Sequence, residues 1–282
     1  MKLHLLFISL LVSSMAVSQS DIASFTSSPN SNYAVVSPTG VVDESASGAD
    51  LTWDFTSLVQ DSTVQNTYAA PTAEELSTYP GTTTVLSVTN TASSTANLLF
   101  LKEDAAGVSL TGTDEESLDL NFADDNAFIG DFPLSYNYDN TDNIAGSFSS
   151  LLPTGATATG TFSGTINSNV DAYGTLNIND LGAGAYSDAV TRLKTVEDFI
   201  LNVTSPVTTT REVTRTIYYY YDNQTGELIL RSSTADIVAP TGATTTTQRI
   251  EVFKNISSST DDEIFESNIT AYPNPANDIL RL

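Results

Sequence analysis

The clearest structural signal in this chain is the stretch REVTRTIYYYYDNQTGELILR, residues 211–231. Its first half, up to Tyr221, is rich in β-branched and aromatic residues, and a second strand-like run covers residues 227–231. The segment DNQTG between them, residues 222–226, consists of residue types that turns prefer. Two strand-like runs joined by such a segment predict an antiparallel β-hairpin.

Four consecutive tyrosines, Tyr218 to Tyr221, end the first strand of this hairpin. Because neighbouring residues of a strand point to opposite faces, Tyr218 and Tyr220 are expected on one face. Tyr219 and Tyr221 are then expected on the other face, with one pair packed in a core and the other pair exposed on the sheet. Tyrosine suits strands well, which favours this interpretation over the alternative of an aromatic platform that stacks on a sugar ring.

Similar short runs, separated by clusters of Gly, Asn and Asp, continue through the rest of the chain. The expected strands cover residues 83–89, 97–102, 108–111, 117–122, 134–138, 157–165, 166–170, 172–178 and 244–254. In the last of these, Glu251 is expected to face away from Ile250 and Val252. One short helix is expected after a capping box formed by Thr72 and Glu75. These patterns predict an all-β fold, either an antiparallel sandwich or a strongly curved sheet, with one short helix.

The composition changes along the chain and divides it into four expected segments. These are a signal peptide at 1–18, an all-β body at 19–254, an acidic linker at 255–268 and the start of a further domain at 269–282. In the first segment, Lys2 precedes a short apolar run, and Ala16 and Ser18 supply the small residues of a cleavage site. That run is too short for a membrane-spanning helix, and no other run approaches the required length.

The composition also excludes several kinds of activity. The chain has no Cys, and its only histidine, His4, lies in the expected signal peptide. Thiolate nucleophiles, Ser-His-Asp triads and His- or Cys-bound metals are therefore excluded from the mature chain. With 34 Asp and Glu against 10 Lys and Arg, the net charge of −24 repels nucleic acids and anionic lipids. A carboxylate-dependent glycosidase stays open because it needs only two acidic side chains, although nothing singles out a pair.

Two acidic clusters are the candidates for a metal site. Asp124 and Asp125 lie in LDLNFADDN, and Asp139 and Asp142 lie in YDNTDN. Calcium prefers such hard oxygen ligands, so a structural calcium ion is one interpretation, and no other cofactor is expected. Asp and Asn are also ordinary turn residues, and neither stretch has the regular spacing of a calcium-binding loop, which favours plain turns.

The chain ends in AYPNPANDILRL, residues 271–282. Two prolines one residue apart remove two N–H donors, so no sheet continues through them, and a new strand can begin afterwards. The motif Tyr272, Pro273, Asn274 and Pro275, followed by a run with Leu280 and Leu282, resembles the opening of the C-terminal sorting domain of type IX secretion cargo. The family domain continues for several dozen residues, so residues 269–282 are expected to be the incomplete start of that small β-sandwich.

This resemblance implies export to the surface or surroundings of a Gram-negative bacterium. The implied partners are signal peptidase and the outer-membrane secretion machinery. The body is similar to uncharacterised all-β regions of such cargo from Bacteroidota, through LTWDF at 51–55 and AYGTLNI at 172–178. We expect a non-enzymatic exported protein that binds an extracellular ligand or glycan. The alternative is a carbohydrate-binding module or a carboxylate-dependent enzyme acting on polysaccharides.

Overall fold

The computed structural model describes residues 19–115, 118–152 and 155–254. The predicted signal peptide, acidic linker and sorting motif, Tyr272 to Leu282, lie outside the described residues. The described chain is almost entirely β-strand, with one short helix, which confirms the predicted all-β class. Its sheet closes on itself into a barrel, a different shape from the predicted sandwich or strongly curved sheet.

The helix α1 covers Ala73–Thr78. The strands are β1 (Asn32–Pro38), β2 (Gly48–Phe55), β3 (Leu58–Ala69), β4 (Thr84–Asn90), β5 (Ala96–Asp104), β6 (Gly107–Glu115), β7 (Leu118–Asp125), β8 (Ala127–Gly130), β9 (Asp139–Leu151), β10 (Thr157–Ile178), β11 (Tyr186–Ser205), β12 (Thr209–Asp222), β13 (Leu228–Val238) and β14 (Thr244–Lys254). As the sequence predicted, β12 and β13 form a hairpin, whose turn is held by Asp222 Oδ1 accepting from the backbone N–H groups of Gln224 and Thr225.

Twelve antiparallel strands form the barrel, in the order β11-β12-β13-β14-β1-β3-β4-β5-β6-β7-β9-β10. The ring closes because β10 pairs with β11 as well as with β9. Two further strands lie beside the ring: β2 pairs in parallel with β10, and β8 pairs with β6. Closure leaves no free strand edge around most of the ring, which protects the sheet from unwanted pairing.

The strand β10 differs from its prediction. Three separate runs were expected between residues 157 and 178, with bends at Gly and Asn, but the structure has one strand of 22 residues. Gly164 lies inside this strand, where a Cβ would lie 2.0 Å from the backbone oxygen of Asp198 in β11. Glycine therefore permits close approach of two strands here and makes no turn. The strand expected at 134–138 is also wrong, since Leu134 makes only an isolated bridge with Ile22.

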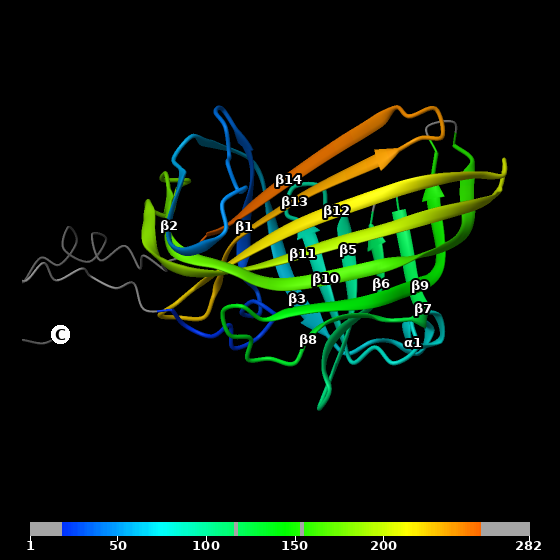
Figure 1. Ribbon diagram of the computed structural model, residues 1–282, viewed down its shortest axis with the longest axis horizontal. Coiled ribbons are helices and arrows are strands. Elements are labelled where there is room, and N and C mark those ends of the chain that lie inside the picture. Colours follow the sequence, from blue (N-terminus) through cyan, green and yellow to red (C-terminus); the bar gives the residue numbers. More distant parts are fainter. Residues whose placement is uncertain (1–18, 116–117, 153–154, 255–282) are drawn as a thin grey trace, which may run out of the picture.

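The main core lies inside the barrel. Figure 1 shows the long strands β10 to β14 crossing β5, β6 and β7 at a steep angle, so that the two groups of strands form facing walls. Phe122 and Phe162 meet edge-on between these walls, with ring centroids 5.1 Å apart. Tyr219 and Tyr221 of the hairpin belong to this core. The steep crossing resembles the packing of orthogonal sheets, which places side chains of both walls in one interior.

A second, smaller core lies on the other face of the same long strands. Trp53 and Phe55 of β2 cover the side of β12 that carries Tyr220, which is fully buried. The alternation predicted for the four tyrosines is confirmed, but the expectation of an exposed pair is wrong. Because β2 pairs with the end of β10, it covers the outer face that Tyr218 and Tyr220 occupy. We call residues around Tyr220 and Trp53 the outer core.

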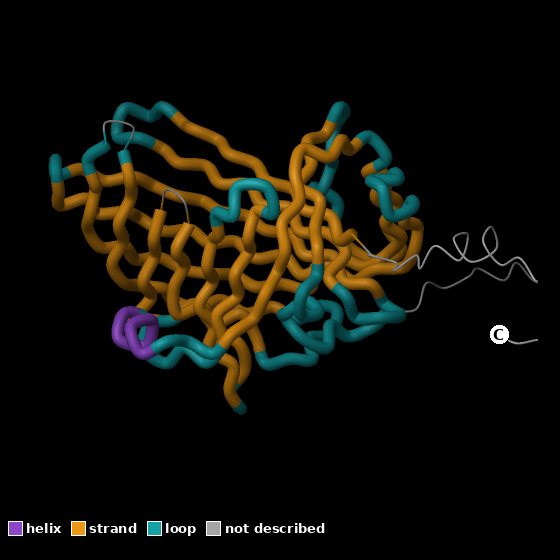
Figure 2. Tube along the Cα trace, turned by 180° about the vertical axis from the view of Figure 1, so that it is seen from behind, coloured by secondary structure: helices purple, strands orange, loops and turns teal. Residues whose placement is uncertain are grey.

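The remaining features fit local rules. The helix α1 begins at the predicted capping box, in which Glu75 N–H donates to Thr72 Oγ1 and Thr72 N–H donates to the Glu75 carboxylate. Figure 2 shows α1 at the margin of the sheet. Among the described residues, no helix has the length and apolar character required to cross a membrane. One irregularity concerns β14, which pairs with β13 over residues 244–252 but with β1 only over residues 250–254.

Candidate ligand-binding cavity

A cavity of about 350 Å³ lies inside the barrel between β4–β6 on one side and β12–β14 on the other. Its lining residues are Val88, Asn97, Leu99, Leu110, Thr113, Glu115, Arg215, Ile217, Tyr219, Arg231, Ser233, Ala235, Thr247, Gln248, Arg249 and Glu251. Its volume falls within the range of small-molecule sites, about 300 to 1,000 Å³. We call it the arginine cavity, because three of the ten Lys and Arg residues of the chain line it.

The strand register explains why this part of the barrel is not filled. Facing residues on β12, β13 and β14 form three rows across the inner face: Tyr219, Arg231 and Glu251; Ile217, Ser233 and Arg249; Arg215, Ala235 and Thr247. The middle strand therefore contributes only Ser233 and Ala235 to two of the three rows. Small side chains at these positions leave space that larger side chains occupy elsewhere in the interior.

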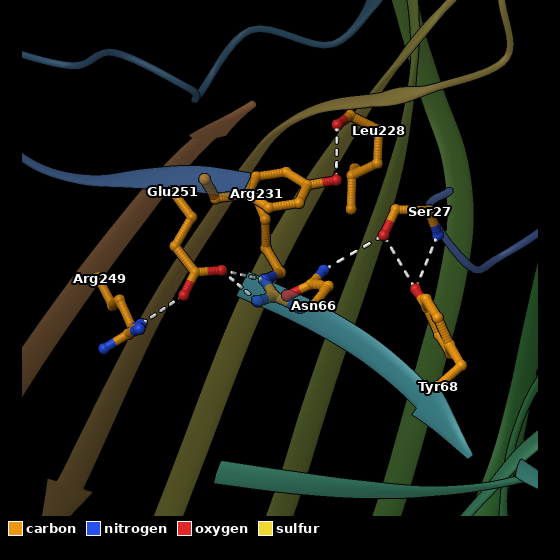
Figure 3. A network of polar contacts seen from close by, with 8 residues as sticks. Ser27, Asn66, Tyr68, Leu228, Arg231, Arg249 and Glu251 are labelled. Carbon is orange, nitrogen blue, oxygen red and sulfur yellow. Dashed lines mark hydrogen bonds and ion pairs between the residues drawn. The ribbon is translucent and has the colours of Figure 1, made fainter. Parts of the chain in front are cut away.

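The polar wall of the cavity contains a triad of Arg231, Glu251 and Arg249, shown in Figure 3. Arg231 Nε donates to Glu251 Oε2 over 2.8 Å, and its Nη2 bonds the same oxygen. Arg249 Nε donates to Glu251 Oε1 over 2.7 Å. Burial alone would raise the pKa of Glu251, but the charges and hydrogen bonds of both arginines outweigh it and lower that pKa. Glu251 therefore stays ionised between two cations.

A second triad of Glu197, Arg215 and Glu115 has the opposite charge order. Arg215 binds Glu197 through two parallel bonds, Nε to Oε2 at 3.0 Å and Nη2 to Oε1 at 2.8 Å. Its Nη1 donates to Glu115 Oε1 over 3.2 Å. Burial acts to lower the pKa of Arg215, yet the two carboxylates outweigh it and raise that pKa. This arginine is held by both carboxylates through three of its five N–H groups.

The charged side chains at the mouth differ in exposure from those inside. The Arg249 and Glu115 side chains are 44% and 38% exposed, whereas the Glu251 side chain is 2% exposed. Arg249 and Glu115 therefore lie where the cavity meets solvent. The lining carries three arginines and two glutamates, a net charge of +1, in a chain of net charge −24. The buried Glu197, which pairs with Arg215 but is not one of the lining residues, balances this charge, so the two triads together are neutral.

Buried polar atoms without partners mark the same region. Thr113 is 1% exposed and lines the cavity, and its Oγ1 has no hydrogen bond within the described part of the chain. In a smaller adjoining hollow lined by Arg231, Asn66 Nδ2 donates to Ser27 Oγ over 3.2 Å, but Asn66 Oδ1 lacks a described partner. Unpaired buried polar groups are rare and costly in proteins. A ligand or ordered water in the cavity would satisfy the Thr113 hydroxyl.

The outer core contains a third arginine cluster, formed by Arg192, Asp171, Glu44, Ala46 and Tyr220. The Nε and Nη2 atoms of Arg192 donate to the two oxygens of Asp171, both over 2.8 Å. Its Nη1 donates to Glu44 O and Tyr220 Oη, and its Nη2 also donates to Ala46 O. These bonds use all five N–H groups of the guanidinium. We call this arrangement the Arg192 cluster, and it leaves no donor for a ligand.

Aromatic rings complete the Arg192 cluster. The Arg192 guanidinium lies 4.6 Å from the ring centre of Tyr218 and 5.2 Å from that of Trp53. Lys194 lies 5.7 Å from the same Tyr218 ring. Because cations and neighbouring rings occupy these aromatic faces, Tyr218 and Trp53 do not offer the flat platform on which a sugar would stack. The platform alternative for the tyrosine run has no support from this geometry.

The aspartates proposed as metal ligands lie outside the arginine cavity. Asp124 and Asp125 are exposed at the end of β7. Asp142 accepts from Phe128 N–H over 3.0 Å, and Asp139 accepts from Asn167 Nδ2 over 2.8 Å. In residues 19–115, 118–152 and 155–254, no group of three or more His, Cys, Asp or Glu is arranged to hold a metal ion. Structural calcium remains a prediction from the sequence.

The residues that line the arginine cavity were not singled out from the sequence. A usable signal was present, because Arg215 shares its strand face with Ile217 and Tyr219, which were expected to include core positions. A charged residue on an apolar strand face indicates an interior polar site. Comparison of the chain with protein-family models, with curated proteins and with solved structures gives no match.

Proposed function

We propose that this chain is an exported, non-enzymatic protein that binds a small extracellular ligand inside its barrel. The observation that carries the proposal is the arginine cavity, with buried ion pairs and the unpaired Thr113 hydroxyl beside an empty volume. Buried ion pairs rarely stabilise a fold more than apolar side chains of similar size would. Their presence around an unfilled space therefore favours recognition over packing.

The cavity supports binding better than hydrolysis. A carboxylate-dependent glycosidase needs one carboxyl with a raised pKa to act as the general acid. The buried cavity carboxylate, Glu251, has a lowered pKa and is held by two arginines. Burial and the neighbouring Asp119 do raise the pKa of Asp114, but neither aspartate lines the cavity. The polysaccharide-acting alternative therefore has no site in the arginine cavity.

Ligand binding can be tested by filling the cavity. Titration with anilinonaphthalene sulfonate, whose fluorescence rises in apolar sites, should show saturable binding to the wild-type chain. Ala235→Trp places a large ring among the lining residues and should abolish that binding. Ala106→Trp, at an exposed turn between β5 and β6, is the matched control and should bind as the wild type does. Equal binding by both variants would place the dye elsewhere and contradict the proposal.

Export rests on the sequence motifs at the two ends of the chain. In a secreting host, a tagged chain with Pro273→Ala and Pro275→Ala should lose surface delivery, because the sorting motif needs its stiff turn. Asn277→Ala, four residues after Pro273 and outside the motif, serves as the control. Cell fractionation and surface labelling supply the measurement. Surface delivery that is unchanged after deletion of residues 269–282 would remove the sorting part of the proposal.

A further inference from the structure

We infer that the ligand of the arginine cavity is a small amphipathic acid, whose anionic group binds at the Arg231–Glu251–Arg249 triad. This inference rests on the proposed binding function and specifies the chemical class of its ligand. The two walls of the cavity differ in character, the triad carries excess positive charge, and it has unused donors.

The triad has a net charge of +1, because two arginines share the single carboxylate of Glu251. The second triad has the opposite balance, with Arg215 shared by Glu197 and Glu115. An anion is therefore attracted to the triad of Arg231, Glu251 and Arg249 and is not favoured at the second triad, which carries Glu115. This distribution of charge would orient a bound acid with its anionic group toward Arg231 and Arg249.

Donors for an anion are present at the triad of Arg231, Glu251 and Arg249. Arg249 uses only Nε in hydrogen bonds within the described residues, which leaves both of its terminal amino groups. Arg231 uses Nε and Nη2, both toward Glu251, which leaves Nη1. The guanidinium group suits the two oxygens of a carboxylate, and such charge-assisted bonds are stronger than neutral ones. These donors, unlike those of Arg192, remain for a bound group.

The opposite wall combines three aliphatic side chains with Asn97, Thr113 and Glu115. Val88, Leu99 and Leu110 line the cavity from β4, β5 and β6, and the unpaired hydroxyl of Thr113 lies among them. A ligand with a hydrocarbon body would bury that body against these side chains while its acid group meets the arginines. A fully polar ligand, such as an inorganic anion, would leave the aliphatic side chains without a partner. A neutral hydrocarbon would leave the arginine donors unused.

Calorimetric titration with three probes of equal chain length separates these cases: octanoate, octanol and octylammonium. We expect octanoate to bind the intact chain about tenfold or more tightly than octanol, and octylammonium to bind more weakly than either. Equal binding of octanoate and octanol would overturn the inference and leave the proposed binding function intact. Failure of the wild-type chain to bind either these probes or the dye would overturn both.

A pair of variants assigns the anion to the triad. Arg249→Gln should weaken octanoate binding about tenfold and leave octanol binding unchanged. Lys102→Gln removes one positive charge from a side chain of similar exposure, 40% against 44%, in a surface ion pair with Asp104. This control should bind octanoate as the wild type does. Equal weakening by both variants would show a general charge effect and contradict the assignment to the triad.

Discussion

The Arg192 cluster and the arginine cavity contain the same kind of side chain on the two faces of the same sheet, Arg192 on β11 and the cavity arginines on β12 to β14. Arg192 is fully buried, and all five of its N–H groups have protein acceptors. In the cavity, Arg249 donates one hydrogen bond to Glu251 and Arg231 donates two. The number of donors left over therefore separates the structural Arg192 from the two candidate binding arginines.

Removal of Arg192 tests this comparison with the largest expected effect on stability. Arg192→Met would leave Asp171 and the carbonyl groups of Glu44 and Ala46 without their donor in the outer core. We expect the free energy of unfolding to fall by about 3 to 5 kcal/mol, the cost of leaving a buried charge unpaired. Urea denaturation followed by circular dichroism measures it. A loss below about 1 kcal/mol would show that the cluster does not hold the outer core together.

Arg231→Met removes an arginine that uses fewer N–H groups in protein hydrogen bonds than Arg192 and more than Arg249. Glu251 would lose one arginine but keep its bond to Arg249 Nε, so the buried carboxylate would still have a cation. We expect a loss of about 2 kcal/mol in the free energy of unfolding, smaller than for Arg192→Met. The same denaturation experiment applies. A loss as large as that of Arg192→Met would mean that the cavity arginine is also structural, and the distinction by donor count would fail.

Arg249→Gln should have the smallest effect on stability of the three. Its side chain is 44% exposed, and ion pairs at such positions contribute little because water screens them. We expect a loss of about 0.5 to 1 kcal/mol, again measured with urea, while octanoate binding falls about tenfold. Separation of the two effects is the outcome that supports a binding role. Large destabilisation together with unchanged binding would reverse the interpretation.

The pH dependence of stability distinguishes the two regions by sign. The folded pKa of Glu251 is lowered, so its stabilisation is present above the unfolded pKa of about 4.3 and is lost as the pH falls through the folded pKa. Burial outweighs the hydrogen bonds from Ser232 and Tyr220 and raises the folded pKa of Glu44. The contribution of Glu44 is therefore present at low pH and lost as the pH rises through that raised pKa.

Two substitutions isolate these contributions. Relative to Glu251→Gln, the wild-type chain should gain stability as the pH rises from about 3 to 7. Relative to Glu44→Gln, it should lose stability over the same range. The measurement is the difference in unfolding free energy between wild type and variant at each pH, and we expect these slopes to be smaller effects than the losses above. If the stability difference changed with pH in the same direction for both variants, the opposite pKa shifts of Glu251 and Glu44 would be contradicted.

Local features of the fold could be predicted from the sequence, and long-range ones could not. The hairpin at 211–231, the capping box at Thr72 and the alternation of Tyr218 to Tyr221 depend on neighbouring residues, and the structure confirms them. Closure of the barrel depends on the pairing of β10 with both β9 and β11, which no local sequence pattern predicts. For the same reason, the sequence predicts bends at the glycines inside β10, whereas the structure shows close contact between strands there.

Part of the candidate site could be predicted from the sequence. Glu251 was expected to face away from Ile250 and Val252, and it does so, since those two pack in the outer core while Glu251 lines the cavity. What could not be predicted is that Glu251 faces Arg231 across the β13–β14 ladder. That contact depends on the register between these two strands. Register between strands is set by the whole fold, so the triad appears only in three dimensions.

The partial pairing of β14 has a kinetic consequence. Over residues 244–249 this strand is paired with β13 on one side, and its pairing with β1 begins only at Ile250. Thr247, Gln248 and Arg249, which line the cavity, belong to that singly paired half. Opening residues 244–249 breaks backbone hydrogen bonds to β13 alone, so this half-strand should open more readily than a segment that is paired on both sides. We therefore expect ligand residence times to follow the opening rate of this half-strand.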